Sequence, residues 1–135
     1  MTGRRKPKAV AVRAAPVEIP IARGDILWIC CDPSQGAEPR KTRTCVVVSN
    51  DIANRFGQAI TVVPTQAYTA ERAERAYMAD LRHPRSNLAD HRVANASMVM
   101  TYDRARITAR AGRASPEAIA DIDRALSMHL GLRFP

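Results

Sequence analysis

The residues best suited to chemistry lie in a loop between two apolar runs. One acid, Glu38, is followed there by three cations within four positions, Arg40, Lys41 and Arg43. The proline and glycine residues of the loop are enough to make a turn, so the cations need another explanation. An arginine guanidinium presents a planar fork of donors that binds two phosphate oxygens at once. The loop therefore predicts a site for a negatively charged ligand.

Any further chemistry must come from simple polar side chains. The sequence has no glycine-rich phosphate loop, no G-x-S-x-G elbow, no HExxH and no cysteine–histidine metal cluster. We interpret His83, His91 and His129 as surface residues rather than catalytic bases. RNA can supply its own nucleophile, because its 2′-hydroxyl can attack the neighbouring phosphorus. The protein then needs only to align the strand, move protons and stabilise charge, without a metal or cofactor.

Charge and composition favour an anionic partner, most simply nucleic acid. The formal net charge is +8 and the sequence pI is about 10.3. Residues 1–22 contain five basic residues and one acid, so half of this charge belongs to the N-terminal segment. Aromatic residues make up only 4%, which argues against the base-stacking platforms of RRM-type proteins.

Cysteine use and hydropathy indicate the compartment. Cys30, Cys31 and Cys45 are odd in number and lack CxxC spacing, which argues against a disulfide framework or a zinc site. No apolar run approaches the roughly 20 residues of a membrane span, and no signal core follows the basic N-terminus. We expect a cytoplasmic protein without a membrane segment.

Hydrophobic patterning predicts one domain at 21–135 behind a flexible, basic tail at 1–20. Segment 70–81 favours a helix in its first half and a strand in its second. The expected strands lie at 23–32, 43–50, 59–64, 92–102 and 104–113, and a capped helical turn at 50–56.

The clearest element is a terminal amphipathic helix. Ser115 is a good N-cap, Pro116 suits the first helical position, and Gly131 closes the helix. Its expected buried face consists of Ile119, Ile122, Leu126 and Leu130. Short strands, helical turns and this helix predict an α+β domain around a small, strongly bent sheet or barrel.

The order of these segments resembles the MazF/PemK family of toxin endoribonucleases, the mRNA interferases. The resemblance is carried by "RGDILWICCDPSQGAEPRKTR", "VVVSNDIANRF", "ITVVP", "MVMTYDRARI" and "SPEAIADIDRALSMHLGL", over residues 23–132. It implies a small SH3-like β-barrel, a homodimer, single-stranded RNA as substrate and an antitoxin with an acidic, disordered segment. Cleavage would be sequence-specific and independent of metal.

The resemblance also assigns residues. Arg43 matches the catalytic arginine and Glu38 the loop glutamate, while Arg40 and Lys41 would hold the RNA backbone. Arg23, which opens the first motif, is a further expected RNA contact.

Three positions depart from the family pattern. Thr44 replaces the proline that usually follows the catalytic arginine. The family's P-x-T strand is Pro64-Thr65-Gln66 here, so Gln66 takes the threonine position without a gap and Thr65 takes it with a one-residue deletion or bulge. Both remain candidate catalytic residues.

On the later strand, Asn95 and Ser97 stand where some members carry an Arg or Asn and then an acid. Both are candidate RNA contacts, but Ser97 cannot act as a carboxylate base. Two other functions therefore stay open: a binding module for RNA or antitoxin that has lost catalysis, and a toxin resembling gyrase poisons.

Overall fold

The computed structural model describes residues 20–82 and 86–133, so the expected tail lies outside the described residues except for Pro20. The strands are β1 (Asp25–Cys30), β2 (Thr42–Val47), β3 (Ala59–Ala67), β4 (Met78–Asp80), β5 (Arg92–Asn95), β6 (Met100–Asp103) and β7 (Ile107–Arg113). The helices are α1 (Asp51–Phe56), α2 (Ala70–Ala73) and α3 (Pro116–Leu130), with 3₁₀ turns η1 (Ala96–Met98) and η2 (Arg104–Arg106).

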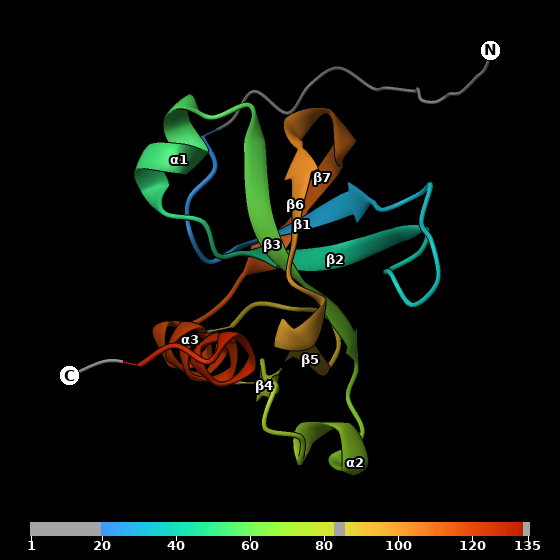
Figure 1. Cartoon of the computed structure of the whole chain (residues 1–135), viewed down its shortest axis with the longest axis vertical. Coiled ribbons are helices and arrows are strands. Elements are labelled where there is room, and N and C mark those ends of the chain that lie inside the picture. The colour runs from blue at the N-terminus through green and yellow to red at the C-terminus, as the bar shows by residue number, and fades with distance from the viewer. Residues whose placement is uncertain (1–19, 83–85, 134–135) are drawn as a thin grey trace.

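The described strands form one antiparallel sheet in the order β4-β5-β3-β2-β1-β7, with β6 also paired to β3. β3 crosses the molecule from α1 to α2 (Figure 1). One edge of β3 pairs with β2, and the other pairs with β6 and then β5. The predicted α+β class is confirmed, but the predicted barrel is not closed, because the end strands β4 and β7 do not pair. Helix α3 covers one face of this open sheet.

The sheet is buried on both faces along β2. Val46 and Val47 point to opposite sides and are each 1% exposed. Val46 packs with Ile26 and with α3, whereas Val47 packs with Leu27 in a second cluster. The strand expected at 43–50 is therefore buried on both faces at Val46 and Val47, whereas Val48 is only half-buried.

Two of the predicted segments each contain two elements in the structure. Segment 70–81 contains both proposed elements in turn, α2 and then β4. The strand expected at 92–102 is interrupted by η1, because the Asn95 side chain accepts a hydrogen bond from the Ser97 backbone nitrogen at 3.0 Å. β5 and β6 thus pair with successive parts of β3.

Helix α3 begins and ends as predicted but buries a different face. Ser115 caps it, and Gly131 ends it with a φ of +68°. The buried residues are Ala118, Ile122 and Ala125. Small alanines let the helix approach the sheet closely, which leaves Ile119 and Leu126 partly buried at the flanks and Leu130 52% exposed. No helix among the described residues is long and apolar enough to cross a membrane.

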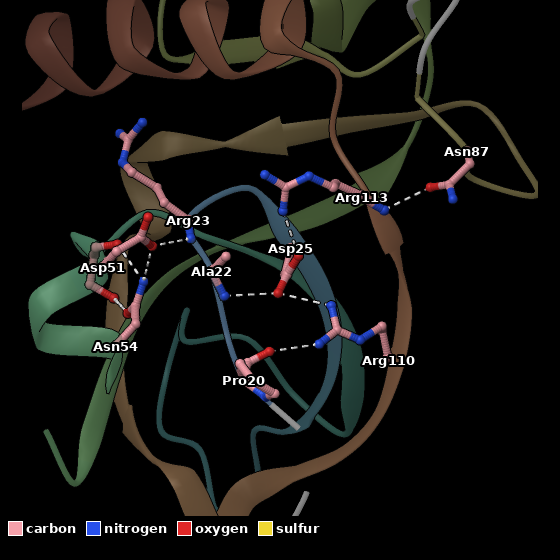
Figure 2. Close-up of polar contacts among 10 residues, drawn as sticks. Pro20, Ala22, Arg23, Asp25, Asp51, Asn54, Asn87, Arg110 and Arg113 are labelled. Carbon is pink, nitrogen blue, oxygen red and sulfur yellow. Dashed lines mark hydrogen bonds and ion pairs between the residues drawn. The ribbon is translucent and has the colours of Figure 1, made fainter. Parts of the chain in front are cut away.

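Asp25 fastens the start of β1 to β7. Asp25 is only 4% exposed, so its carboxylate is buried. One oxygen accepts from Arg113 Nη1 at 2.6 Å, and the other accepts from the Ala22 backbone nitrogen at 2.9 Å and pairs with Arg110 Nη1 at 2.8 Å (Figure 2). The aspartate of the R-G-D opening is therefore a structural anchor.

The residues before Asp25 join β1 to two helices. The Arg23 backbone nitrogen donates to Asp51 Oδ1 at 2.7 Å, which lowers the pKa of that carboxyl group (Figure 2). Arg23 Nε donates to the Val48 carbonyl at 2.9 Å, and its guanidinium pairs with Asp123 of α3. Gly24 has a φ of +96°, and a Cβ there would lie 2.5 Å from a side-chain carbon of α3, so this position requires glycine.

Candidate functional site

Most of the predicted site residues line one pocket beside the loop that joins β1 to β2. The pocket has a volume of about 290 Å³. Six of its lining residues are ones that the sequence singled out: Glu38, Arg40, Arg43, Thr65, Gln66 and Asn95. The rest of the lining consists of Gly36, Ala37, Pro39, Pro64 and Met98. Residues from three separate parts of the chain therefore meet here.

The loop is fixed at its base and projects from the sheet at the ends of β1 and β2 (Figure 1). The Cys31 backbone nitrogen donates to the Lys41 carbonyl at 2.7 Å, which extends the β1–β2 pairing beyond the strands. Arg106 Nη1 donates to the carbonyls of Cys30 at 3.0 Å and Asp32 at 2.5 Å. These bonds fix where the loop leaves the sheet, and so they fix the position of the basic side chains that the loop contains.

Glu38 closes a turn near the tip of this loop. Its backbone nitrogen donates to the Gln35 carbonyl at 3.1 Å, and its Oε1 accepts from the Gln35 backbone nitrogen at 2.8 Å. Glu38 is exposed and has no ion pair among the described residues. Within the described part of the chain nothing bonds to its second carboxylate oxygen, which can accept a hydrogen bond from a ligand.

Arg43 is oriented but not neutralised. Its Nε donates to the Arg40 carbonyl at 3.0 Å. Its two terminal nitrogens have no partner among residues 20–82 and 86–133. A guanidinium held through Nε keeps its outer edge available for two oxygens of one phosphate group.

Thr65 and Gln66 point to opposite sides of β3. Thr65 is 0% exposed, and its Oγ1 lies 2.5 Å from Thr44 Oγ1 and accepts from Arg92 Nε at 2.7 Å. Gln66 is half-buried, and its Oε1 accepts from Asn95 Nδ2 at 3.4 Å. Both residues line the pocket, but the Thr65 hydroxyl already has two partners within the protein, whereas the Gln66 amide is bonded to Asn95, another residue of the pocket.

Asn95 and Ser97 are coupled to each other. The Oδ1 of Asn95 accepts from both the backbone nitrogen of Ser97 at 3.0 Å and its hydroxyl at 2.5 Å. These bonds direct the Asn95 amide nitrogen toward Gln66. Of these two residues, only Asn95 lines the pocket. Ser97 does not line it but orients the Asn95 side chain through these two hydrogen bonds.

A second pocket lies on the other side of Arg40 and Arg43, which line both cavities. It has a volume of about 410 Å³ and includes Lys41, Trp28 and Arg92. Lys41 therefore lies near the first pocket without lining it. The predicted residue Arg23 lies apart, since its bonds join β1 to α1 and α3.

Arg92 is a residue that sequence reasoning missed. Its Nη1 donates to Asp90 Oδ2 at 3.1 Å, and its Nη2 donates to the Thr65 carbonyl at 3.2 Å. All three of its nitrogens thus have partners, whereas Nε alone of the three nitrogens of Arg43 has one among the described residues. No local motif marks it, because its role depends on the pairing of β5 with β3.

Free thiols lie beneath the loop. Cys31 is 2% exposed and Cys45 is fully buried. A hydrogen bond from Cys45 lowers the pKa of the Cys31 thiol to about 7, with Arg43 and Arg106 contributing. The same bond raises the pKa of Cys45. The Cys31 thiol therefore ionises more readily than a free cysteine, whereas Cys45 stays protonated beside it.

The pocket combines a cationic fork, a free carboxylate oxygen and two amides. This set can bind a phosphodiester and exchange protons with it. Within the described part of the chain, no three His, Cys, Asp or Glu side chains converge on a point where a metal ion could bind.

Comparison with known proteins adds independent information. Residues 22–130 match the model of the family described as PemK-like, MazF-like toxin of type II toxin–antitoxin system. Endoribonuclease MazF9 of Mycobacterium tuberculosis is 34% identical over 115 residues, which cover 82% of this chain and 96% of that protein.

Solved structures show the same fold. MazF from Deinococcus radiodurans superposes with a TM-score of 0.72 at 19% identity, covering 84% of this chain and 99% of that one. A mycobacterial endoribonuclease in complex with its cognate antitoxin gives a TM-score of 0.68 at 20% identity, covering 85% and 99%.

Proposed function

The chain belongs to the PemK-like, MazF-like family of type II toxins, and we propose on this basis that it is an endoribonuclease toxin that cleaves single-stranded RNA. The observation that carries the proposal is the pocket in which Arg43 lies beside Glu38, Gln66 and Asn95, with two nitrogens that have no partner among the described residues. A relative at 34% identity is named an endoribonuclease, which supports the same activity.

The proposed reaction is transesterification. The 2′-oxygen attacks the adjacent phosphorus, the bond to the 5′-oxygen breaks, and the products carry a 2′,3′-cyclic phosphate and a 5′-hydroxyl. Arg43 would bind the two non-bridging oxygens as charge builds on them. Glu38 would accept the 2′-proton, while Arg40 and Lys41 hold neighbouring phosphates. These roles need neither a metal nor a cofactor, and hydrogen bonds to splayed bases would set the cut sequence.

The same surface suits an antitoxin. RNA and an acidic, disordered segment would compete for the cations of the loop, so one groove would serve both partners. A mycobacterial endoribonuclease of the same fold has been solved in complex with its cognate antitoxin. We further propose a cytoplasmic homodimer whose sheet is an open version of the SH3-like barrel.

The proposal is tested by incubating the purified protein with a long synthetic RNA in EDTA and mapping the new ends. We expect discrete cuts that leave 2′,3′-cyclic phosphate and 5′-hydroxyl ends. A requirement for added metal would refute the metal-free mechanism, and ends with a 5′-phosphate would refute attack by the 2′-oxygen.

The roles of Thr65 and Gln66 can be separated by substitution. Gln66→Ala is expected to slow cleavage about tenfold, because it removes an amide from the pocket and leaves Asn95 without its partner. Thr65→Val removes a buried hydroxyl, so we expect a loss of about 1–3 kcal/mol in stability and a smaller change in cleavage. Single-turnover cleavage and urea unfolding measure the two effects.

Thr65→Ser serves as the control, since it keeps the hydroxyl. If Thr65→Val stayed folded and lost more than 100-fold in cleavage while Thr65→Ser kept its activity, the hydroxyl of Thr65 would be catalytic and the present assignment would be wrong.

A binding module without catalysis is the second candidate. Two observations favour it: the Thr65 hydroxyl is already occupied, and Ser97 supplies no carboxylate. Salt-sensitive RNA binding with no cleavage over a wide range of protein concentration would identify this function.

A further inference from the structure

Two aromatic rings stack on the sheet next to the candidate site. The centroids of Tyr68 and His91 lie 3.9 Å apart, with an interplanar angle of 10°. The Tyr68 backbone nitrogen donates to the His91 carbonyl at 3.1 Å, which continues the pairing of β3 with β5. The His91 Nε2 lies 2.7 Å from Asp80 Oδ1, so β4 fixes the imidazole from the other side. Tyr68 remains 37% exposed.

This stack continues the face that lines the pocket. Side chains alternate along a strand, so Pro64 and Gln66 project from the same side of β3. Tyr68 follows directly after β3 and continues this alternation, because its backbone still pairs with His91. Two residues of strand advance the chain by about 7 Å, which places Tyr68 one step beyond Gln66. His91 directly precedes β5, and the same alternation puts it on the side of Asn95.

The charges around the stack are mixed. Arg72 Nη1 donates to the Ala67 carbonyl at 2.7 Å, so a cation is held beside Tyr68. Asp80 is the nearby acid, and its carboxylate is turned toward His91. The flat Tyr68 ring can stack on a nucleobase, and the Arg72 guanidinium beside it would attract the phosphate of the same nucleotide.

We infer that Tyr68, supported by His91, is a stacking platform for the base of a nucleotide close to the scissile phosphate. This inference rests on the proposed function and adds a binding subsite to it. Arg43 would bind the scissile phosphate. The Tyr68 ring would bind a neighbouring base and so fix the direction in which the RNA strand runs past Arg43. The low aromatic content argued against such platforms, but it could not show that these two rings are brought together.

The test uses an RNA oligonucleotide that the wild-type protein cleaves, made resistant by a 2′-deoxy nucleotide at the cut site. Tyr68→Ala and Tyr68→Leu should weaken its binding by about 5- to 150-fold, the range expected for one stacked base. Tyr68→Phe keeps the flat ring and should bind like the wild type. Phe56→Ala is the matched control, because Phe56 is 78% exposed on α1, at the opposite end of β3 (Figure 1).

A series of oligonucleotides, each lacking one base, locates the contact. We expect one abasic position to weaken binding to the wild type and to Tyr68→Phe but not to Tyr68→Ala. Melting temperatures are measured for each variant, and Tyr68→Leu decides the question if Tyr68→Ala fails to fold.

Failure of the inference and failure of the proposed function look different. If the wild type cleaves RNA but Tyr68→Leu binds with unchanged affinity, or every abasic penalty persists in it, the platform does not exist and the nuclease proposal stands. If the wild type neither cleaves nor binds RNA, both fall. If Tyr68→Leu weakens only an acidic antitoxin peptide, the rings serve that partner and the inference is wrong.

Discussion

Arg43→Ala is expected to slow RNA cleavage by about 100- to 1,000-fold, the usual cost of removing one preorganised donor from a developing oxyanion. The two terminal nitrogens of Arg43 have no partner among the described residues, so this edge can meet a phosphate without breaking a contact. Single-turnover cleavage of the mapped oligonucleotide measures the rate. RNA binding should weaken much less, because neighbouring cations remain.

Two variants separate charge from geometry. Arg43→Lys keeps the positive charge but loses the fork, so it should recover only part of the rate. Arg40→Ala removes a cation that shares the pocket but is bonded to the Gly36 carbonyl at 3.2 Å, and it should mainly raise KM and flatten the salt dependence. Cleavage by Arg43→Ala within tenfold of the wild type would exclude Arg43 as the phosphate-stabilising group.

Asp25→Ala should lower the free energy of unfolding by about 3 kcal/mol, the lower end of the range for a broken buried ion pair. The carboxylate is buried and accepts one backbone and two guanidinium donors, all of which lose their partner. The loss stays near the lower end because the side chains of Arg110 and Arg113 are 35% and 54% exposed and can be solvated. Urea denaturation followed by circular dichroism gives the value.

Asp123→Ala is the matched control for Asp25→Ala. Asp123 also pairs with an arginine, Arg23, but its side chain is 50% exposed, so its removal should change stability by less than about 1 kcal/mol. Equal effects of the two substitutions would show that burial of Asp25 contributes nothing. The folded Asp25→Ala variant should cleave RNA at the wild-type rate, because Asp25 lies outside the pocket.

The structure also changes the interpretation of the family motifs. The R-G-D opening is a structural junction: Arg23 and Asp25 bond to other elements, and Gly24 supplies a conformation with φ of +96°. The S-N-D-x-x-N turn is likewise structural, since Asn54 is fully buried and donates to the Ser49 carbonyl at 2.7 Å. By contrast, the loop after β1 presents Arg43, whose two terminal nitrogens have no partner among the described residues and can bind a ligand.

Local sequence determined the elements and the loop chemistry of this protein. Strand periodicity, the cap at Ser115 and the glycine at Gly131 act over a few residues, so the ends of α3 followed from them directly. The same holds for the cluster around Glu38 and Arg43, whose members lie close together along the chain. Family resemblance then connected that loop with β3 and β5.

Only the tertiary structure decided what depends on strand pairing. The register of β3 with β5 places Thr65 opposite Ala94 and Gln66 opposite Val93, which sends the two candidate side chains to opposite faces. The same pairing stacks Tyr68 on His91, across a long stretch of intervening chain. A shift of one residue would exchange the faces without changing the sequence. Such contacts depend on long-range pairing energies, and no local pattern in a single sequence records them.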